Sequence, residues 1–173
     1  STVEDLVVQM RGRFLALAAA HSLTAPAAPV VDAAVLEKRP LRGLLEAILE
    51  PFKGSLPVEL TVEEVLVGRA AVTPLALVFY ELCTNAVKYG AFSENAGRLA
   101  ISSERRGDRL ILHWDETFAP VQANPVVQGQ GFGTLMCEMA LQDQLDGSFQ
   151  RQFTNSGMRA SLDLNFARVS ADL

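Results

Sequence analysis

The clearest pattern of apolar and polar positions along the chain is helical and lies in residues 73–92. Apolar side chains recur there at steps of three and four residues, which places them on one face of a helix. The members of this face are Leu75, Val78, Phe79, Leu82 and Ala86. Thr73 and Pro74 are typical of the first positions of a helix, and Gly90 is typical of its end. We therefore predict a central helix whose apolar face packs in the core.

A second helical pattern occupies the first residues of the chain. Apolar residues follow alternating steps of four and three residues, as in a helix that packs against a partner helix. The members of this stripe are Val3, Val7, Met10, Phe14, Leu17 and His21. We interpret residues 1–24 as the second helix of an incomplete helical hairpin; a helix that packs on its own domain is the alternative. His21 is expected to be a packed core histidine rather than a phosphate acceptor.

Prolines and turn residues divide the rest of the chain. Pro26 and Pro29 interrupt the first helical pattern, so we interpret residues 25–39 as a linker and residues 40–168 as one domain. Apolar periods then predict a helix at 40–50 closed by Pro51, a strand at 58–63, a short run at 65–67, the helix at 73–92, a hairpin of 98–104 with 109–115, a loop at 117–130, a helix at 134–145 and a hairpin of 148–153 with 158–166. This order predicts an α/β two-layer sandwich, with helices on one face of a mixed, mostly antiparallel sheet.

Composition narrows the possible partners. Hydrophobic residues make up 49% of the 173 residues and charged residues 20%, which is ordinary for a globular domain. The net charge is −5 and the basic residues are scattered, so no nucleic-acid partner is predicted. The apolar runs fall short of the roughly 20 residues that a membrane helix needs, so we expect no membrane contact and a cytoplasmic location. Cys83 and Cys137 form no CxxC pair and are expected to be buried thiols.

Three polar residues of the helix at 73–92 share a face that differs from the apolar one. Glu81, Asn85 and Lys88 are spaced i, i+4 and i+7. Such residues often form a solvated face with weak pairing, although Asn is a poor helix former in the middle of a helix. A carboxylate and an amide oxygen one turn apart suit Mg²⁺, and the ammonium group one turn further along suits phosphates. These residues alone leave both interpretations open, a solvated face and a magnesium and phosphate site.

Two further stretches contain residues of chemical interest. Gly129, Gly131 and Gly133 alternate directly before a helix, where free backbone amides can bind an anion; a flexible loop is the alternative. Glu116 lies where a strand enters the long loop, and Trp114 shares its strand face. This carboxylate is either a surface residue or an acceptor for an amino group such as that of adenine. The sequence shows no Ser/His/Asp pattern and no His/Cys cluster, so neither a hydrolytic triad nor a zinc site is predicted.

The order of these motifs resembles a known family. The segments ELCTNAVKYGAFS at 81–93, HWDE at 113–116 and GFGT at 131–134 follow one another before a helix and a final hairpin. This order resembles the catalytic ATP-binding domain of sensor histidine kinases in the GHKL superfamily, and most closely the HWE group with its motifs HELxTNAxKYGAL, WxE and GFGT. The resemblance covers most of residues 40–166. Residues 10–24 also resemble the second helix of that family's dimerisation and phosphotransfer hairpin.

The resemblance implies a role for each matching residue. Asn85 and Glu81 would hold Mg²⁺ on the phosphates of ATP, with Glu81 also helping to handle a proton. Lys88 would contact a phosphate, and Tyr89 would shape the pocket. Glu116 would accept a hydrogen bond from the amino group of adenine. In this family a loop forms a lid over the nucleotide, and the helix that follows the loop receives the phosphates at its start. The hinge of this lid and the start of that helix would be Gly131, Phe132, Gly133 and Thr134.

The implied function is transfer of the γ-phosphoryl group of ATP to a histidine on a helix missing from this fragment. The implied partners are the protein's own dimerisation and phosphotransfer helices, in a homodimer, and a response regulator. The HRxKN segment that carries the acceptor histidine in this family is absent, so the fragment is not expected to autophosphorylate alone.

Two departures from the family motifs motivate other interpretations. Tyr80 stands where the HWE group has its histidine, and Phe118-Ala119 replaces the usual glycines. The first alternative is a degenerate GHKL dimerisation and signalling module without nucleotide turnover. The second is another type of GHKL ATPase.

Overall fold

The structure is a computed structural model that describes residues 39–54, 56–93, 97–118 and 132–170. The helix predicted for residues 1–24 and residues 25–38 of the predicted linker lie outside this part of the chain, as do residues 119–131 of the predicted loop. The prediction of a separate N-terminal helix and linker therefore stays a prediction.

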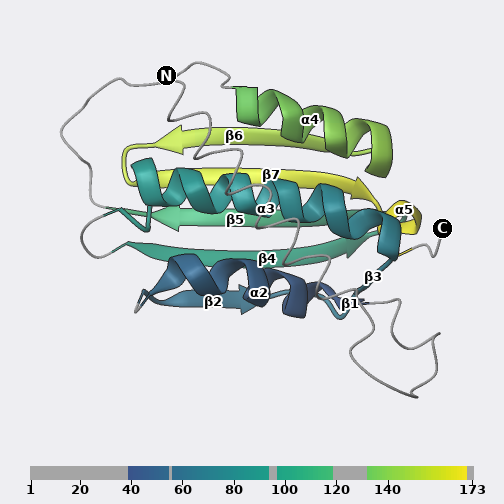
Figure 1. Cartoon of the computed structure of the whole chain (residues 1–173), viewed down its shortest axis with the longest axis horizontal. Helices are drawn as coiled ribbons and strands as arrows, with labels where there is room; N and C mark the ends of the chain where they lie inside the picture. Colours follow the sequence, from purple (N-terminus) through teal and green to yellow (C-terminus); the bar gives the residue numbers. More distant parts are fainter. Residues whose placement is uncertain (1–38, 55, 94–96, 119–131, 171–173) are drawn as a thin grey trace.

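A five-stranded sheet forms one layer of the described domain (Figure 1). Its strands lie in the order β2 (Val58–Thr61), β4 (Arg98–Arg106), β5 (Arg109–Thr117), β7 (Gly157–Asn165) and β6 (Ser148–Thr154). β2 runs parallel to β4, and every other neighbouring pair is antiparallel. A separate two-stranded sheet pairs β1 (Arg39–Pro40) with β3 (Leu66–Val67). The predicted mixed, mostly antiparallel sheet is confirmed.

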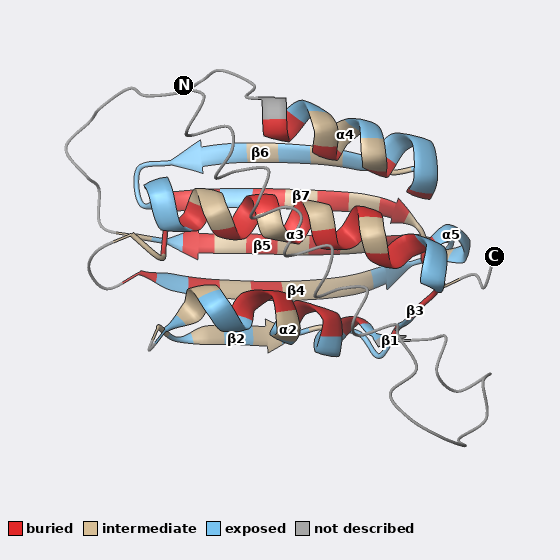
Figure 2. Ribbon diagram, viewed as in Figure 1, coloured by how far each residue is buried: buried red, intermediate tan, exposed pale blue. Residues whose placement is uncertain are grey.

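Three helices cover one face of the sheet, which confirms the predicted two-layer sandwich (Figure 1). They are α2 (Leu41–Lys53), α3 (Arg69–Tyr89) and α4 (Phe132–Leu145), and the short α5 (Phe166–Ser170) follows β7. Figure 2 shows the buried positions on the helices and on the strands beneath them. The core lies between these two layers.

The central helix α3 buries the whole predicted apolar face, including Phe79, which is 1% exposed. Among the described helices, α3 is also the one long and apolar enough to cross a membrane by length and composition, but 61% of its apolar window is buried inside the fold. Its apolar character is therefore that of a core helix. Cys83 on α3 and Cys137 on α4 are buried free thiols, as predicted.

The predicted start of α3 was wrong. The helix begins at Arg69 after Gly68, so Thr73 does not cap it and Pro74 lies inside it. Ala71 and Val72 are buried in the core, and their packing continues the helix towards Gly68, although the ring of Pro74 removes one backbone donor. The predicted end was right, because α3 stops at Tyr89 and Gly90 follows it.

The predicted end of α2 was also wrong. Pro51 was expected to close this helix, but it lies inside the last turn, and α2 ends at Lys53. Gly54, which follows, has a φ of 51° that favours glycine. The helix α4 begins two residues earlier than predicted, at Phe132, and both hairpins form where expected.

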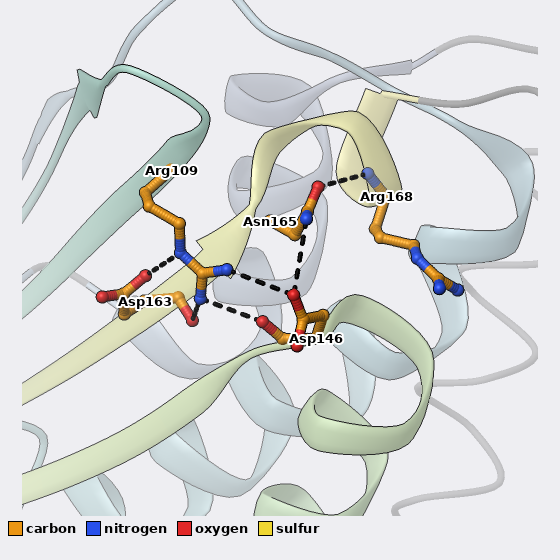
Figure 3. A network of polar contacts seen from close by, with 5 residues as sticks. All are labelled: Arg109, Asp146, Asp163, Asn165 and Arg168. Atoms are coloured by element: carbon orange, nitrogen blue, oxygen red, sulfur yellow. Dashed lines mark hydrogen bonds and ion pairs between the residues drawn. The ribbon is translucent and has the colours of Figure 1, made fainter.

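A polar network fastens the C-terminal end of α4 to the sheet (Figure 3). Nε of Arg109 on β5 donates to Oδ1 of Asp163 on β7 at 2.6 Å, and Nη2 donates to the carbonyl of Asp146, which follows α4, at 2.9 Å. The hydrogen bond to Asp163 raises the pKa of Arg109. α5 was not predicted; Asn165 caps it by accepting the N–H of Arg168 at 3.2 Å.

Candidate functional site

Most of the predicted site residues in the described part of the chain come from elements that begin or end at one edge of the sheet, the edge at which β5 ends (Figure 1); Glu81 lies further back, in the interior of α3. The C-terminal end of α3, the end of β5, the beginning of α4 and the turn between β6 and β7 all lie there. Cross-strand pairing of Thr117 with Gly157 joins the end of β5 to that turn. α3 packs against α4, so the two helices flank this edge together.

Glu116 is the buried polar centre of this edge. Its side chain is 4% exposed and faces the helices because Trp114, Glu116 and the other buried residues of β5 alternate with more exposed ones. Oε1 accepts the indole N–H of Trp114 at 2.8 Å, and Oε2 accepts the backbone N–H of Ala91 at 2.9 Å. The interpretation of Glu116 as a surface carboxylate is therefore wrong, whereas the expectation that Trp114 shares its strand face is confirmed, with Trp114 1% exposed in the core.

The hydrogen bond from Ala91 ties the end of α3 to β5. Ala91 follows Gly90, the residue directly after the helix, and both are buried. A Cβ atom on Gly90 would overlap Oε2 of Glu116 and would lie 3.1 Å from Cα of Ala86. Gly90 therefore has a second function besides ending the helix, since it leaves room for the carboxylate of Glu116.

Burial sets the electrostatics of Glu116. Desolvation raises the pKa of Glu116, and the hydrogen bonds from Ala91 and Trp114 oppose that rise because they favour the charged form. Desolvation also raises the pKa of Cys83, and the nearby charge of Glu116 adds to that effect. Cys83 is therefore held as a neutral thiol, which suits neither a nucleophile nor a metal ligand.

The polar face of α3 passes from the core to solvent. Glu81 is 8% exposed, Asn85 is half-buried, and Lys88 and Tyr89 are exposed, with 58% of Tyr89 accessible. A fully solvated face is excluded because Glu81 is buried. Tyr80, at the position of the usual histidine, packs edge-on against Phe52 of α2 with ring centroids 5.5 Å apart.

The beginning of α4 is joined to β6 by Arg151, a residue that was not predicted to belong to the site. Gly133 and Thr134 are buried, and Oγ1 of Thr134 accepts a hydrogen bond from Nη2 of Arg151 on β6 at 2.7 Å. Alternation of Phe149 and Arg151 with exposed residues of β6 is the signal that places Arg151 on the helix-covered face. Gly131 and the side chain of Phe132 lie outside the described residues.

The residues at this edge have the chemistry that a magnesium nucleotide needs. Asn85 and Glu81 supply an amide and a carboxylate oxygen, which are ligands that Mg²⁺ accepts together with phosphate oxygens. An ionised carboxylate has about four acceptor positions, so Glu116 keeps capacity for an amino group beyond its two protein donors. Within the described residues no group of three or more His, Cys, Asp or Glu side chains is placed to hold a metal ion.

Curated relatives of this chain are histidine kinases. It is 32% identical over 168 residues to blue-light-activated histidine kinase 1 of Erythrobacter litoralis, an alignment that covers 94% of this chain and 44% of the relative. It is 35% identical over 95 residues to a blue-light-activated histidine kinase of Rhizobium johnstonii, covering 54% of this chain and 27% of that protein. The chain thus spans less than half the length of these relatives. No protein-family model matches the sequence.

Solved structures share the fold. The histidine kinase domain of an Erythrobacter litoralis blue-light-activated histidine kinase superposes with a TM-score of 0.68 at 16% identity, covering 94% of this chain and 79% of that one. The catalytic domain of histidine kinase ThkA gives a TM-score of 0.58 at 16% identity over 74% of this chain and 93% of that one. Relatives and fold agree: over 94% of its length the chain is similar to a histidine kinase, and it has the fold of histidine kinase catalytic domains.

Proposed function

We propose that this chain is the ATP-binding catalytic domain of a sensor histidine kinase and transfers the γ-phosphoryl group of ATP to a histidine side chain. The observation that carries the proposal is that three elements begin or end at one edge of the sheet: the last turns of α3, which contain Asn85, the end of β5, which contains the buried Glu116, and the first turn of α4. The acceptor histidine would be supplied by a dimerisation and phosphotransfer hairpin of a homodimer, and a response regulator would then receive the phosphoryl group.

Each residue at the edge has a distinct task in this proposal. Glu116 accepts a hydrogen bond from the amino group of adenine, which fixes the orientation of the base. Tyr89 shapes the pocket beside the base. Asn85 and Glu81 hold the metal ion, and Lys88 contacts a phosphate. The glycines at 131 and 133 and the first turn of α4 receive the phosphates through backbone N–H groups.

Phosphoryl transfer depends mainly on positioning and on compensation of charge. Bound Mg²⁺ would neutralise negative charge on the phosphates. The residues of this chain orient the nucleotide, whereas the acceptor imidazole supplies the nucleophilic nitrogen. We therefore expect binding of ATP by this chain alone, and transfer only after a hairpin with a histidine is supplied.

The proposal is tested by titrating the protein with ATP in the presence and absence of Mg²⁺. Asn85→Ala should weaken Mg-dependent ATP binding about tenfold or more, the loss expected when one charge-assisted contact is removed. Its thermal stability should be equal or slightly higher, because Ala favours a helix by up to about 0.7 kcal/mol relative to Asn. Gln142→Ala on the exposed face of α4 is the matched control and should leave ATP affinity unchanged.

Two results would contradict the proposal. Absence of saturable binding at millimolar ATP would favour the degenerate signalling module. Unchanged Mg-dependent affinity in Asn85→Ala would show that the polar face of α3 does not hold the metal ion.

A further inference from the structure

Arg151 on β6 is joined to the first turn of α4. Its Nη2 donates to Oγ1 of Thr134 at 2.7 Å, and Thr134 is 6% exposed. The two residues are 17 positions apart in sequence, and their contact joins α4 to β6 on the helix-covered face of the sheet. The guanidinium also lies 5.8 Å from the ring centroid of Phe149, the preceding residue on the same strand face.

Within the described residues, no ion pair explains the charge of Arg151. Across residues 39–54, 56–93, 97–118 and 132–170, no carboxylate forms a salt bridge with Arg151, whereas Arg109 has two and Arg159 and Arg106 have one each. The N-terminal end of a helix carries partial positive charge, so a guanidinium there is electrostatically unfavourable. A hydrogen bond to one buried hydroxyl group is therefore the main described contact that keeps Arg151 in this place.

The hydrogen bond constrains both partners. Because Thr134 Oγ1 uses an acceptor position for Arg151, the hydroxyl proton points away from the guanidinium, and the side chain of Thr134 cannot rotate without losing the bond. The backbone of Gly133 and Thr134 is consequently fixed relative to the sheet. Backbone donors must be held within about 0.5 Å to act on a ligand with full effect.

We propose that Arg151 is a positioning residue for the nucleotide phosphates, which it serves by holding Thr134 and the first turn of α4 on β6. This inference rests on the proposed function, since it assigns that turn to phosphate binding. It also accounts for a cation that lies at a positive helix end without a carboxylate partner among the described residues, because bound phosphates would supply negative charge there.

The test measures the affinity of folded variants for ATP and for adenosine. Arg151→Met should weaken ATP binding about tenfold, as expected when a charged contact is lost, and should change adenosine binding less than twofold. Arg151→Lys should recover most of the ATP affinity because it keeps the charge and a donor. Arg168→Met, which removes the same charge from α5, is the matched control and should behave as the wild type.

Variants of Thr134 separate positioning from general damage to the fold. Thr134→Val keeps the shape but removes the acceptor, so it should reproduce the loss in Arg151→Met, and the double variant should lose little more. Thr134→Ser should restore binding. ATP affinity of Arg151→Met within twofold of the wild type, an equal loss of adenosine affinity, or additive losses in the double variant would overturn the positioning role. No saturable ATP binding by the wild type would overturn both this inference and the proposed function, whereas normal wild-type binding with an unaffected Arg151→Met would overturn this inference alone.

Discussion

Replacement of Gly90 by alanine should destabilise the protein through Glu116. The added Cβ would overlap Oε2 of Glu116, which accepts the buried N–H of Ala91 at 2.9 Å. The φ of Gly90 is −129°, a value that any residue adopts, so the backbone itself should not be strained. The cost of Gly90→Ala therefore comes from displacement of the carboxylate and from the N–H group that loses its acceptor.

The size of this effect follows from the contact that is lost. A hydrogen bond to a charged group contributes about 1.5–3 kcal/mol, and a buried donor left without an acceptor costs a comparable amount. We expect Gly90→Ala to lower the free energy of unfolding by about 2–3 kcal/mol. In a protein of this size that corresponds to a fall of about 5–10 °C in the melting temperature.

Urea denaturation of two further variants makes the assay decisive. Gly43→Ala is the matched control: Gly43 lies in α2, nothing is within 4 Å of its added Cβ, and the same substitution should stabilise the helix by about 0.5–1 kcal/mol. In a Glu116→Ala background, Gly90→Ala should cost at least about 1 kcal/mol less than in the wild type. An equal cost in both backgrounds would show that the carboxylate of Glu116 is not the cause, and would place the conflict at the backbone of Ala86.

Two further predictions concern charge. Burial raises the pKa of Glu116 above its ordinary value of 4.5, so the folded protein keeps a proton that the unfolded chain has already released. The contribution of Glu116 to the free energy of unfolding is therefore fully present below pH 4.5. It is lost as the pH rises through the folded pKa, and the free energy of unfolding falls by no more than about 1.4 kcal/mol per pH unit. Urea denaturation across this pH range should show that slope in the wild type and not in Glu116→Gln. Arg109→Met should cost about 1–2 kcal/mol in the same assay, because it removes the bonds to Asp163 and to the carbonyl of Asp146, whereas Arg106→Met, in an exposed ion pair, should change stability by less than about 0.5 kcal/mol.

Local patterns in the sequence predict much of the fold. The apolar face of α3 reports burial directly, so Phe79 was correctly placed in the core, and the alternation along β5 correctly places Trp114 and Glu116 on one face. Helix ends were less predictable, because the rules for proline describe isolated helices. Pro74 and Pro51 lie inside α3 and α2, where packing of neighbouring apolar residues outweighs the loss of one backbone donor.

The contacts that organise the site depend on tertiary register. Alternation places Glu116 on the buried face, but nothing local predicts that its acceptor positions meet the N–H of Ala91, 25 residues away. The same limit applies to Arg151, whose spacing predicts a face but not the contact with Thr134. The residues were thus predictable as members of a face, whereas their partners required the packing of α3 and α4 on the sheet.

Two groups of polar contacts in the described part of the domain differ in a way that agrees with the proposed site. At the far end of α4, Arg109 directs its guanidinium to Asp163 and Asp146, so this network is satisfied within the protein (Figure 3). At the opposite edge, Glu116 is a buried acid whose pKa is raised despite two donors, and Arg151 is a cation that no described carboxylate pairs with. Both groups would gain from a ligand that brings an amino group to one and negative charge to the other. A nucleotide carries both, and the hydrogen bonds to Ala91 and Thr134 would keep the two groups in place before it binds.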